Sequence, residues 1–72
     1  MRVSYDPEAD ALYIRLIDDR PQCRNVCLTE QVALDFGPSG ELVGIEVTEA
    51  RAMLGSGNLP QIVLDHVQVA AA

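Results

Sequence analysis

The sequence contains no lysine and no tryptophan, and its 72 residues include one phenylalanine, one histidine and two cysteines. Five arginines stand against eleven aspartates and glutamates, which gives a net charge of −6. Binding to nucleic acid through its phosphates requires a basic surface, so the composition argues against a nucleic-acid partner. A basic protein is the partner that this charge would suit, while solubility is the simpler explanation of the same charge.

Long apolar runs are also missing. A membrane-spanning helix needs roughly 18 or more consecutive apolar residues, and no run in this chain approaches that length. The first residues lead directly into a strand-like pattern and carry no apolar stretch of the kind found in secretory signals. We therefore expect no membrane partner and a cytoplasmic location.

The chain is long enough for one small domain, over residues 1–72. A domain of this size removes only about 60% of its unfolded surface from water, so its core is thin. A thin core favours stabilisation by a second copy. The expected partner is therefore the protein itself, as a homo-oligomer with a dimer favoured.

Alternating apolar and polar residues predict an α+β protein that is mostly β. Two hairpins form a small antiparallel sheet from strands near 2–5, 11–17, 31–36 and 42–48. Residues 23–29 read as a weaker strand at an edge, after a loop at 18–22. Leu12, Ile14 and Leu16 point into the core in this pattern, while Tyr13 and Arg15 point outward.

Turn and cap residues support these boundaries. Gly44 interrupts a strand, which predicts a bulge or a close backbone approach. Thr48 is the expected N-cap of one short helix near 49–54. A glycine joint at 55–58 then precedes a C-terminal segment.

The C-terminal segment near 61–69 fits two patterns. Its valines and isoleucine favour a strand, although the spacing of its apolar residues also fits a helix. A strand after a flexible joint could pair within its own sheet or with that of a second copy. Residues 70–72 are expected to fray.

The acidic turn after the first strand resembles the start of a calcium loop. Asp6, Glu8 and Asp10 have the spacing of its first ligands. The loop also needs a glycine at the sixth position and a bidentate glutamate at the twelfth, where this chain has Ala11 and Ile17. The segment is therefore predicted to be the turn of the first hairpin.

The other chemically active residues form no recognisable site. Cys23 and Cys27 would lie about 13 Å apart on a strand, beyond the ~7 Å limit for a disulfide, and are predicted to be buried free thiols. Asp35 and Glu46 lie on adjacent strands as a candidate carboxylate pair, for which solvated surface residues are the simpler explanation. His66 has no evident nucleophile beside it. The sequence thus nominates no catalytic, cofactor-binding or metal-binding residue, and no cofactor.

Interface chemistry is better represented. Tyrosine and arginine are residue types that often anchor protein interfaces, and apolar residues beyond the glycine joint have no obvious place in the core. Ordinary cross-strand packing is the alternative for the tyrosine and the arginine. The candidate interface residues are Tyr13, Arg15, Ile62, Leu64 and Val67.

Three stretches carry a resemblance to a known family. These are Val-Ser-Tyr-Asp-Pro-Glu-Ala-Asp-Ala-Leu-Tyr-Ile-Arg-Leu at 3–16, Val-Ala-Leu-Asp-Phe at 32–36 and Gly-Glu-Leu-Val-Gly-Ile-Glu at 40–46. Together they resemble the small prokaryotic family called domain of unknown function 2283, over about residues 2–54. The resemblance implies a compact β-rich fold with a short helix. The family has no established activity.

Three functions are compatible with these features. The first is a non-enzymatic oligomeric module for protein interaction. The second is an acidic partner that neutralises a small basic, toxin-like protein, a role that the resemblance also suggests. The third is a small carboxylate-based enzyme with a site between subunits, disfavoured because so short a chain rarely encloses a pocket.

Overall fold

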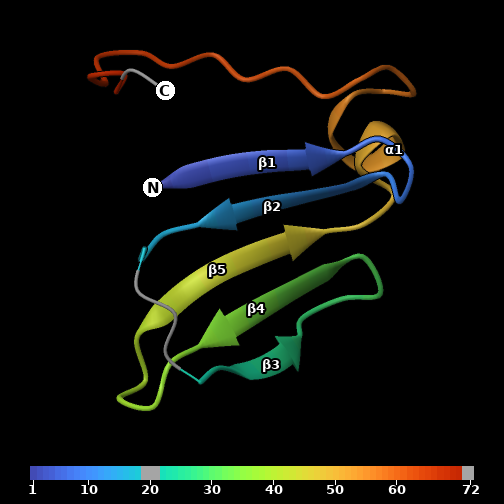
Figure 1. Ribbon diagram of the computed structural model, residues 1–72. Helices are drawn as coiled ribbons and strands as arrows, with labels where there is room; N and C mark the ends of the chain where they lie inside the picture. Colours follow the sequence, from blue (N-terminus) through green and yellow to red (C-terminus); the bar gives the residue numbers. More distant parts are fainter. Residues whose placement is uncertain (19–21, 71–72) are drawn as a thin grey trace.

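The computed structural model describes residues 1–18 and 22–70. Its elements are β1 (Arg2–Asp6), β2 (Ala11–Arg15), β3 (Arg24–Cys27), β4 (Val32–Phe36), β5 (Leu42–Val47) and α1 (Ala50–Leu54). The strands form one antiparallel sheet in the order β1-β2-β5-β4-β3, with β5 in the middle (Figure 1). The predicted loop at 18–22 and frayed end at 70–72 fall largely on residues outside this description.

The predicted fold class is confirmed: the protein is an antiparallel sheet with a short helix. Both predicted hairpins are present, β1–β2 and β4–β5, and β2 pairs with β5 to join them. The weaker segment at 23–29 forms β3, an edge strand paired with β4. No helix among the described residues is both long enough and apolar enough to cross a membrane.

A bulge in β5 changes the end of β2. Phe36 lies opposite Leu42 and Asp35 lies opposite Gly44, which leaves Val43 as an extra residue in β5. The carbonyl oxygen of Val43 accepts hydrogen bonds from the backbone N–H groups of residues 16 and 17, at 2.7 and 3.4 Å. The alternation alone predicted a strand that ends at residue 17. With this bulge, β2 instead ends at Arg15.

The sheet has two chemically different faces, because side chains alternate along each strand and the register aligns them across strands. We call one the apolar face, formed by Val3, Leu12, Ile14, Val26, Val32, Leu34, Phe36, Ile45 and Val47. The opposite, polar face carries Ser4, Tyr13, Arg15, Asn25, Cys27, Ala33, Asp35 and Glu46. The sheet is a single layer in the described chain, so few apolar residues are buried: Leu12, Val43, Val47 and Ala50.

Helix α1 lies at one end of the sheet beside the β1–β2 turn (Figure 1). The prediction that Thr48 caps this helix is wrong. The N-cap is Glu49, in a left-handed conformation with φ of 50° and no side-chain capping bond. Thr48 instead donates through both its backbone N–H and its hydroxyl to the carbonyl oxygen of Gln31, at 2.8 and 3.3 Å. This bonding extends the contact between the ends of β4 and β5 and leaves Thr48 outside the helix.

The prediction of a strand or helix near 61–69 is wrong. These residues form no regular structure and run along the outer side of β1 (Figure 1). Pro60 lacks an N–H, and His66 has a φ of 59°, so both interrupt a regular ladder. Described residues from 59 onward make no backbone hydrogen bond to the sheet.

The prediction that the two cysteines are buried is also wrong. Cys23 and Cys27 are both exposed thiols. Cys27 lies opposite Ala33 at the edge of the polar face, and no second layer covers this face in the described chain. A cysteine is buried only where another element packs against it, and β3 is an edge strand of four residues.

Candidate functional site

Three side chains are joined by hydrogen bonds across the polar face. The Tyr13 hydroxyl donates to Oδ2 of Asp35 at 2.8 Å, and Nδ2 of Asn25 donates to Oδ1 of Asp35 at 2.9 Å. The tyrosine comes from β2, the aspartate from β4 and the asparagine from β3. Both oxygens of one carboxylate are therefore used to connect strands across the sheet.

Gly44 leaves room for the hydrogen bond between Tyr13 and Asp35. It lies on β5, between β2 and β4, opposite both Arg15 and Asp35. A Cβ atom at position 44 would overlap the hydroxyl group of Tyr13. The predicted close approach at this glycine is thus confirmed, because the tyrosine ring passes over its backbone to reach Asp35. The predicted bulge is confirmed as well, one residue earlier.

Tyr13 has an unusual electrostatic environment for a surface residue. Partial burial raises the pKa of its hydroxyl, and the hydrogen bond to Asp35 and the negative charge of that carboxylate raise it further. Arg15 lowers the same pKa and has its guanidinium carbon 6.0 Å from the centre of the tyrosine ring. Tyr13 therefore remains a protonated donor to the carboxylate.

Asp35 and Glu46, the candidate carboxylate pair, do share the polar face. The register places Asp35 opposite Gly44 and Glu46 opposite Ala33, so the two acids are diagonal neighbours on β4 and β5. Such diagonal pairs lie about 7 to 8 Å apart. Asp35 is held by its two donors, whereas Glu46 is exposed. The arrangement gives Asp35 a structural role.

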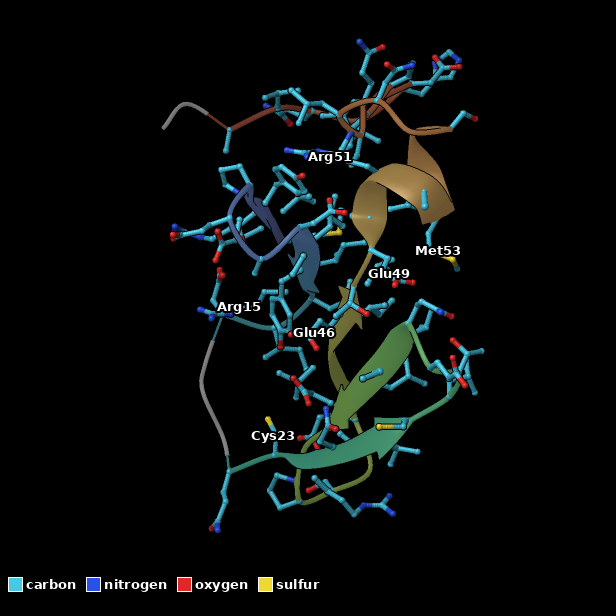
Figure 2. The ribbon with its side chains drawn as sticks, turned by 90° about the vertical axis from the view of Figure 1, so that its right-hand side faces the viewer. Arg15, Cys23, Glu46, Glu49, Arg51 and Met53 are labelled. Carbon is cyan, nitrogen blue, oxygen red and sulfur yellow. The ribbon has the colours of Figure 1, made fainter. Side chains whose placement is uncertain are left out.

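Figure 2 shows how this face is bordered. Arg15 and Cys23 project to the same side of the sheet, and Met53 of helix α1 lies on the other side of the view. Cys23 makes the smallest of the contributions to the pKa of the Tyr13 hydroxyl and raises it. The polar face is therefore a shallow surface of mixed chemistry.

A second centre of hydrogen bonds lies at Asp10, in the predicted turn. Its Oδ1 accepts bonds from the Tyr5 hydroxyl at 2.8 Å and from the backbone N–H of Arg51 at 3.1 Å. Its carbonyl oxygen accepts the backbone N–H of Ala50 at 3.0 Å. Asp10 therefore accepts hydrogen bonds from the first backbone N–H groups of α1, in place of the Thr48 cap that the sequence predicted. Asp10 and Arg51 lie 41 positions apart in the chain.

The other acids of this turn also serve the backbone. Oδ1 of Asp6 accepts the N–H groups of Glu8 and Ala9 at 3.0 and 3.3 Å, the bonding of an Asx turn. This is the turn that the sequence predicted in place of a calcium loop. Among residues 1–18 and 22–70, no three His, Cys, Asp or Glu side chains are grouped closely enough to hold a metal ion.

The five candidate interface residues lie in two separate parts of the molecule. Tyr13 and Arg15 lie half-buried on the polar face of β2, where they contribute to the network described above. The other three are exposed in the C-terminal segment beyond β1: Ile62, Leu64 and Val67. Their role in an interface stays a prediction.

The largest candidate surface was missed by the reasoning from sequence. Leu12, Ile14 and Leu16 were predicted to point into a core, but no second layer covers the apolar face in the described chain. Val3 is 39% exposed, and Ile14, Leu34, Phe36 and Ile45 are only half-buried. The signal was present in the sequence, because one helix of two turns is too short to cover five strands.

The described residues also form a shallow, open hollow at the joint after α1. It is lined by Leu54, Gly55, Ser56, Asn58, Leu59 and Gln61. No acid, base or cysteine lies among these residues, so the hollow has no group that could transfer a proton or activate the hydroxyl of Ser56 as a nucleophile.

These features define a class: a small, single-layer antiparallel β protein with one hydrogen-bonded polar face and one apolar face that no second layer covers among residues 1–18 and 22–70. The model of the family described as protein of unknown function (DUF2283) matches residues 2–51, and the chain belongs to this family. The match includes all five strands and the residues that contact Asp10, and it confirms the resemblance found in the sequence. No curated protein and no solved structure matches the chain.

Proposed function

We propose that the protein is a non-enzymatic interaction module that works as a homodimer, with the apolar face of the sheet as the interface. The uncovered apolar face carries this proposal. A sheet with one apolar face is stabilised when another surface covers that face. A two-fold dimer covers both apolar faces at once, because each copy covers the apolar face of the other with the same part of its own surface.

The amount of exposed surface supports the proposal. The chain has 5636 Å² of accessible surface. A compact monomer of 7.8 kDa has about 4,400 Å², so this chain exposes about 1,200 Å² more than its mass requires. A standard protein interface buries about 800 Å² on each partner. The surplus is therefore large enough to supply one such interface.

The residue types on this face suit a stable interface. The face consists mainly of valine, leucine, isoleucine and phenylalanine, with Tyr5 opposite Leu12. Arg24 lies at its β3 edge, where the guanidinium carbon is 5.7 Å from the centre of the Phe36 ring. An apolar centre with an aromatic residue and an arginine near its rim is typical of protein interfaces.

Sedimentation of paired variants tests the proposal. Val3→Thr with Val26→Thr places two hydroxyl groups on the apolar face without changing side-chain shape or strand propensity. We expect a dimer for the wild type at micromolar concentration and a dissociation constant at least about tenfold higher for this variant. The control is Ser4→Thr with Cys27→Thr, which alters the polar face of the same two strands and should leave the dimer unchanged.

Two outcomes would count against the proposal. A wild-type chain that sediments only as a folded monomer at these concentrations would remove it. A dimer weakened equally by both pairs of variants would place the interface elsewhere. Circular dichroism of each variant distinguishes a lost interface from a lost fold.

Binding of a small basic protein is the second candidate, favoured by the position of the acids. Glu46 is exposed on the polar face and Asp35 lies beside it, so a dimer formed through the apolar faces leaves these acids accessible. Titration of small basic proteins at low salt, with Glu46→Gln as the comparison, tests this role. Affinity that is independent of salt and of Glu46 would exclude it.

A further inference from the structure

We propose that residues 59–69 of each copy lie across the apolar face of the other copy, so that the dimer is formed by reciprocal exchange of C-terminal arms. This inference rests on the homodimer proposed above and names the segment that completes its interface. We call residues 59–69 the arm.

The arm carries apolar groups that the described chain does not cover. Six of its eleven residues are large and apolar, and each is at least half exposed: Leu59, Ile62, Val63, Leu64, Val67 and Val69. A soluble monomer rarely exposes so many neighbouring apolar side chains unless they mark a contact surface. The arm and the apolar face therefore both expose apolar side chains that contact with a partner would bury.

The arm has the length to cover that face. Eleven extended residues span at most about 36 to 40 Å. Five strands lie side by side over about 19 Å, because neighbouring strands are separated by about 4.8 Å. One arm can therefore cross all five strands.

The joint directs the arm to the outer side of β1 rather than onto the apolar face of its own sheet. The backbone N–H groups of Gly55 and Gly57 both bond to the carbonyl oxygen of Arg51, at 2.9 and 2.8 Å. The N–H of Asn58 bonds back to Gly55 at 2.9 Å, and Gly57 has a φ of 90°, in the region that glycine adopts without strain. This turn sends the arm along the outer side of β1 (Figure 1), away from the apolar face of its own chain.

Charge supports the same pairing. The arm has one carboxylate, Asp65, and the apolar face has one arginine at its rim, Arg24. Asp65 is 81% exposed and contacts only His66 of its own arm among the described ion pairs. Exchange gives this carboxylate an arginine partner on the other copy.

A mixed-isotope NMR experiment on the full chain tests the exchange. One half of the sample carries ¹³C and the other does not, and a filtered experiment records only contacts between different chains. We expect contacts from the methyl groups of Ile62 and Val67 to those of Leu34 and Ile45. A dimer in which the arm methyls contact only their own chain, or no sheet methyls, would overturn the exchange and leave the homodimer intact.

Matched variants give a second, independent readout. Ile62→Asp with Val67→Asp places charge on the apolar side chains of the arm, and Gln61→Asp with Gln68→Asp adds the same charge at polar positions. We expect the first pair to raise the dimer dissociation constant by about tenfold or more and the second pair to change it little. Equal effects would overturn the exchange. A monomeric wild type would instead remove the homodimer itself, so the two failures are distinguishable.

Discussion

Tyr13 and Asp35 lie 22 positions apart on strands that do not pair with each other, yet the tyrosine hydroxyl donates to the carboxylate at 2.8 Å. The bond passes over Gly44 of the central strand. It therefore connects the two hairpins directly, in addition to the backbone ladder between them.

Tyr13→Phe removes only the hydroxyl and should lower the free energy of unfolding by about 0.5 to 1.5 kcal/mol, the usual range for one hydrogen bond. Urea denaturation measures the change. Asp35→Ala alone and the double variant complete a mutant cycle, in which the two effects should add to more than the cost of the double change. Full additivity would show that the bond contributes nothing to stability.

Gly44→Ala should destabilise the fold by about 1 to 3 kcal/mol, because the new methyl group overlaps the Tyr13 hydroxyl and forces the ring away from Asp35. In a Tyr13→Ala background the same substitution should cost clearly less, since no ring then crosses position 44. An equal cost in both backgrounds would mean that the glycine is required for a reason other than this ring.

The stability of the fold should decrease at alkaline pH. The pKa of Tyr13 is raised above its ordinary value of 10.0, chiefly by burial and next by the hydrogen bond to Asp35. The unfolded chain thus releases this proton at lower pH than the folded chain, so the stabilisation is complete below about pH 10 and is lost as pH rises through the folded pKa. Urea midpoints between about pH 9 and pH 11 measure the loss.

Tyr13→Phe is the control for this pH dependence. The stability of this variant should decrease less at alkaline pH than that of the wild type. The remainder belongs to Tyr5, whose pKa is also raised, by partial burial and by its bond to Asp10. Identical slopes for wild type and Tyr13→Phe would exclude Tyr13 as the source.

Asp10 should tolerate asparagine and not alanine. Alanine removes the acceptor for both the Tyr5 hydroxyl and the Arg51 backbone N–H, and it is strained at a φ of 52°. We expect a loss of about 1 to 3 kcal/mol for Asp10→Ala and under about 1 kcal/mol for Asp10→Asn, which keeps an acceptor oxygen and suits this backbone conformation. Thermal and urea unfolding measure both. Equal losses would mean that the charge, and its contact with Arg51, is what matters.

Cys23 and Cys27 should react with a maleimide in the native protein. Both are exposed, and Cys27 faces away from the apolar side of the sheet, so a dimer formed through the apolar faces leaves it accessible. Mass spectrometry of samples labelled with and without urea measures the rates. Labelling of Cys27 that requires urea would contradict this orientation of the dimer.

The sheet could be predicted because its signals are local. Alternation of Leu12, Ile14 and Leu16 against Tyr13 and Arg15 assigns a strand and its faces, and turn residues define where hairpins reverse. The requirement for a glycine at position 44 was visible for the same reason. Each of these inferences uses residues that are close together in the chain.

The remaining features depend on contacts between distant residues. Thr48 is a good local cap, but Asp10 bonds to the first N–H groups of the helix from the β1–β2 turn, far away in the chain. The apolar pattern of residues 61–69 fits a strand or a helix, and only the tertiary structure shows that neither forms. Burial of the cysteines likewise depends on whether a second layer packs on the sheet, which alternation does not specify.

The central strand of the sheet, β5, is also the last strand along the chain. Until it docks, the β1–β2 hairpin and the β3–β4 pair have no strand in common. Its pairing with β2 closes the longest loop in the sheet and so carries the largest entropic cost before any contact is gained. Docking of β5 onto β2 should therefore limit the rate of folding. Substitutions along this seam, at Ile14 or Ile45, should slow folding, while changes in the edge strands should mainly accelerate unfolding.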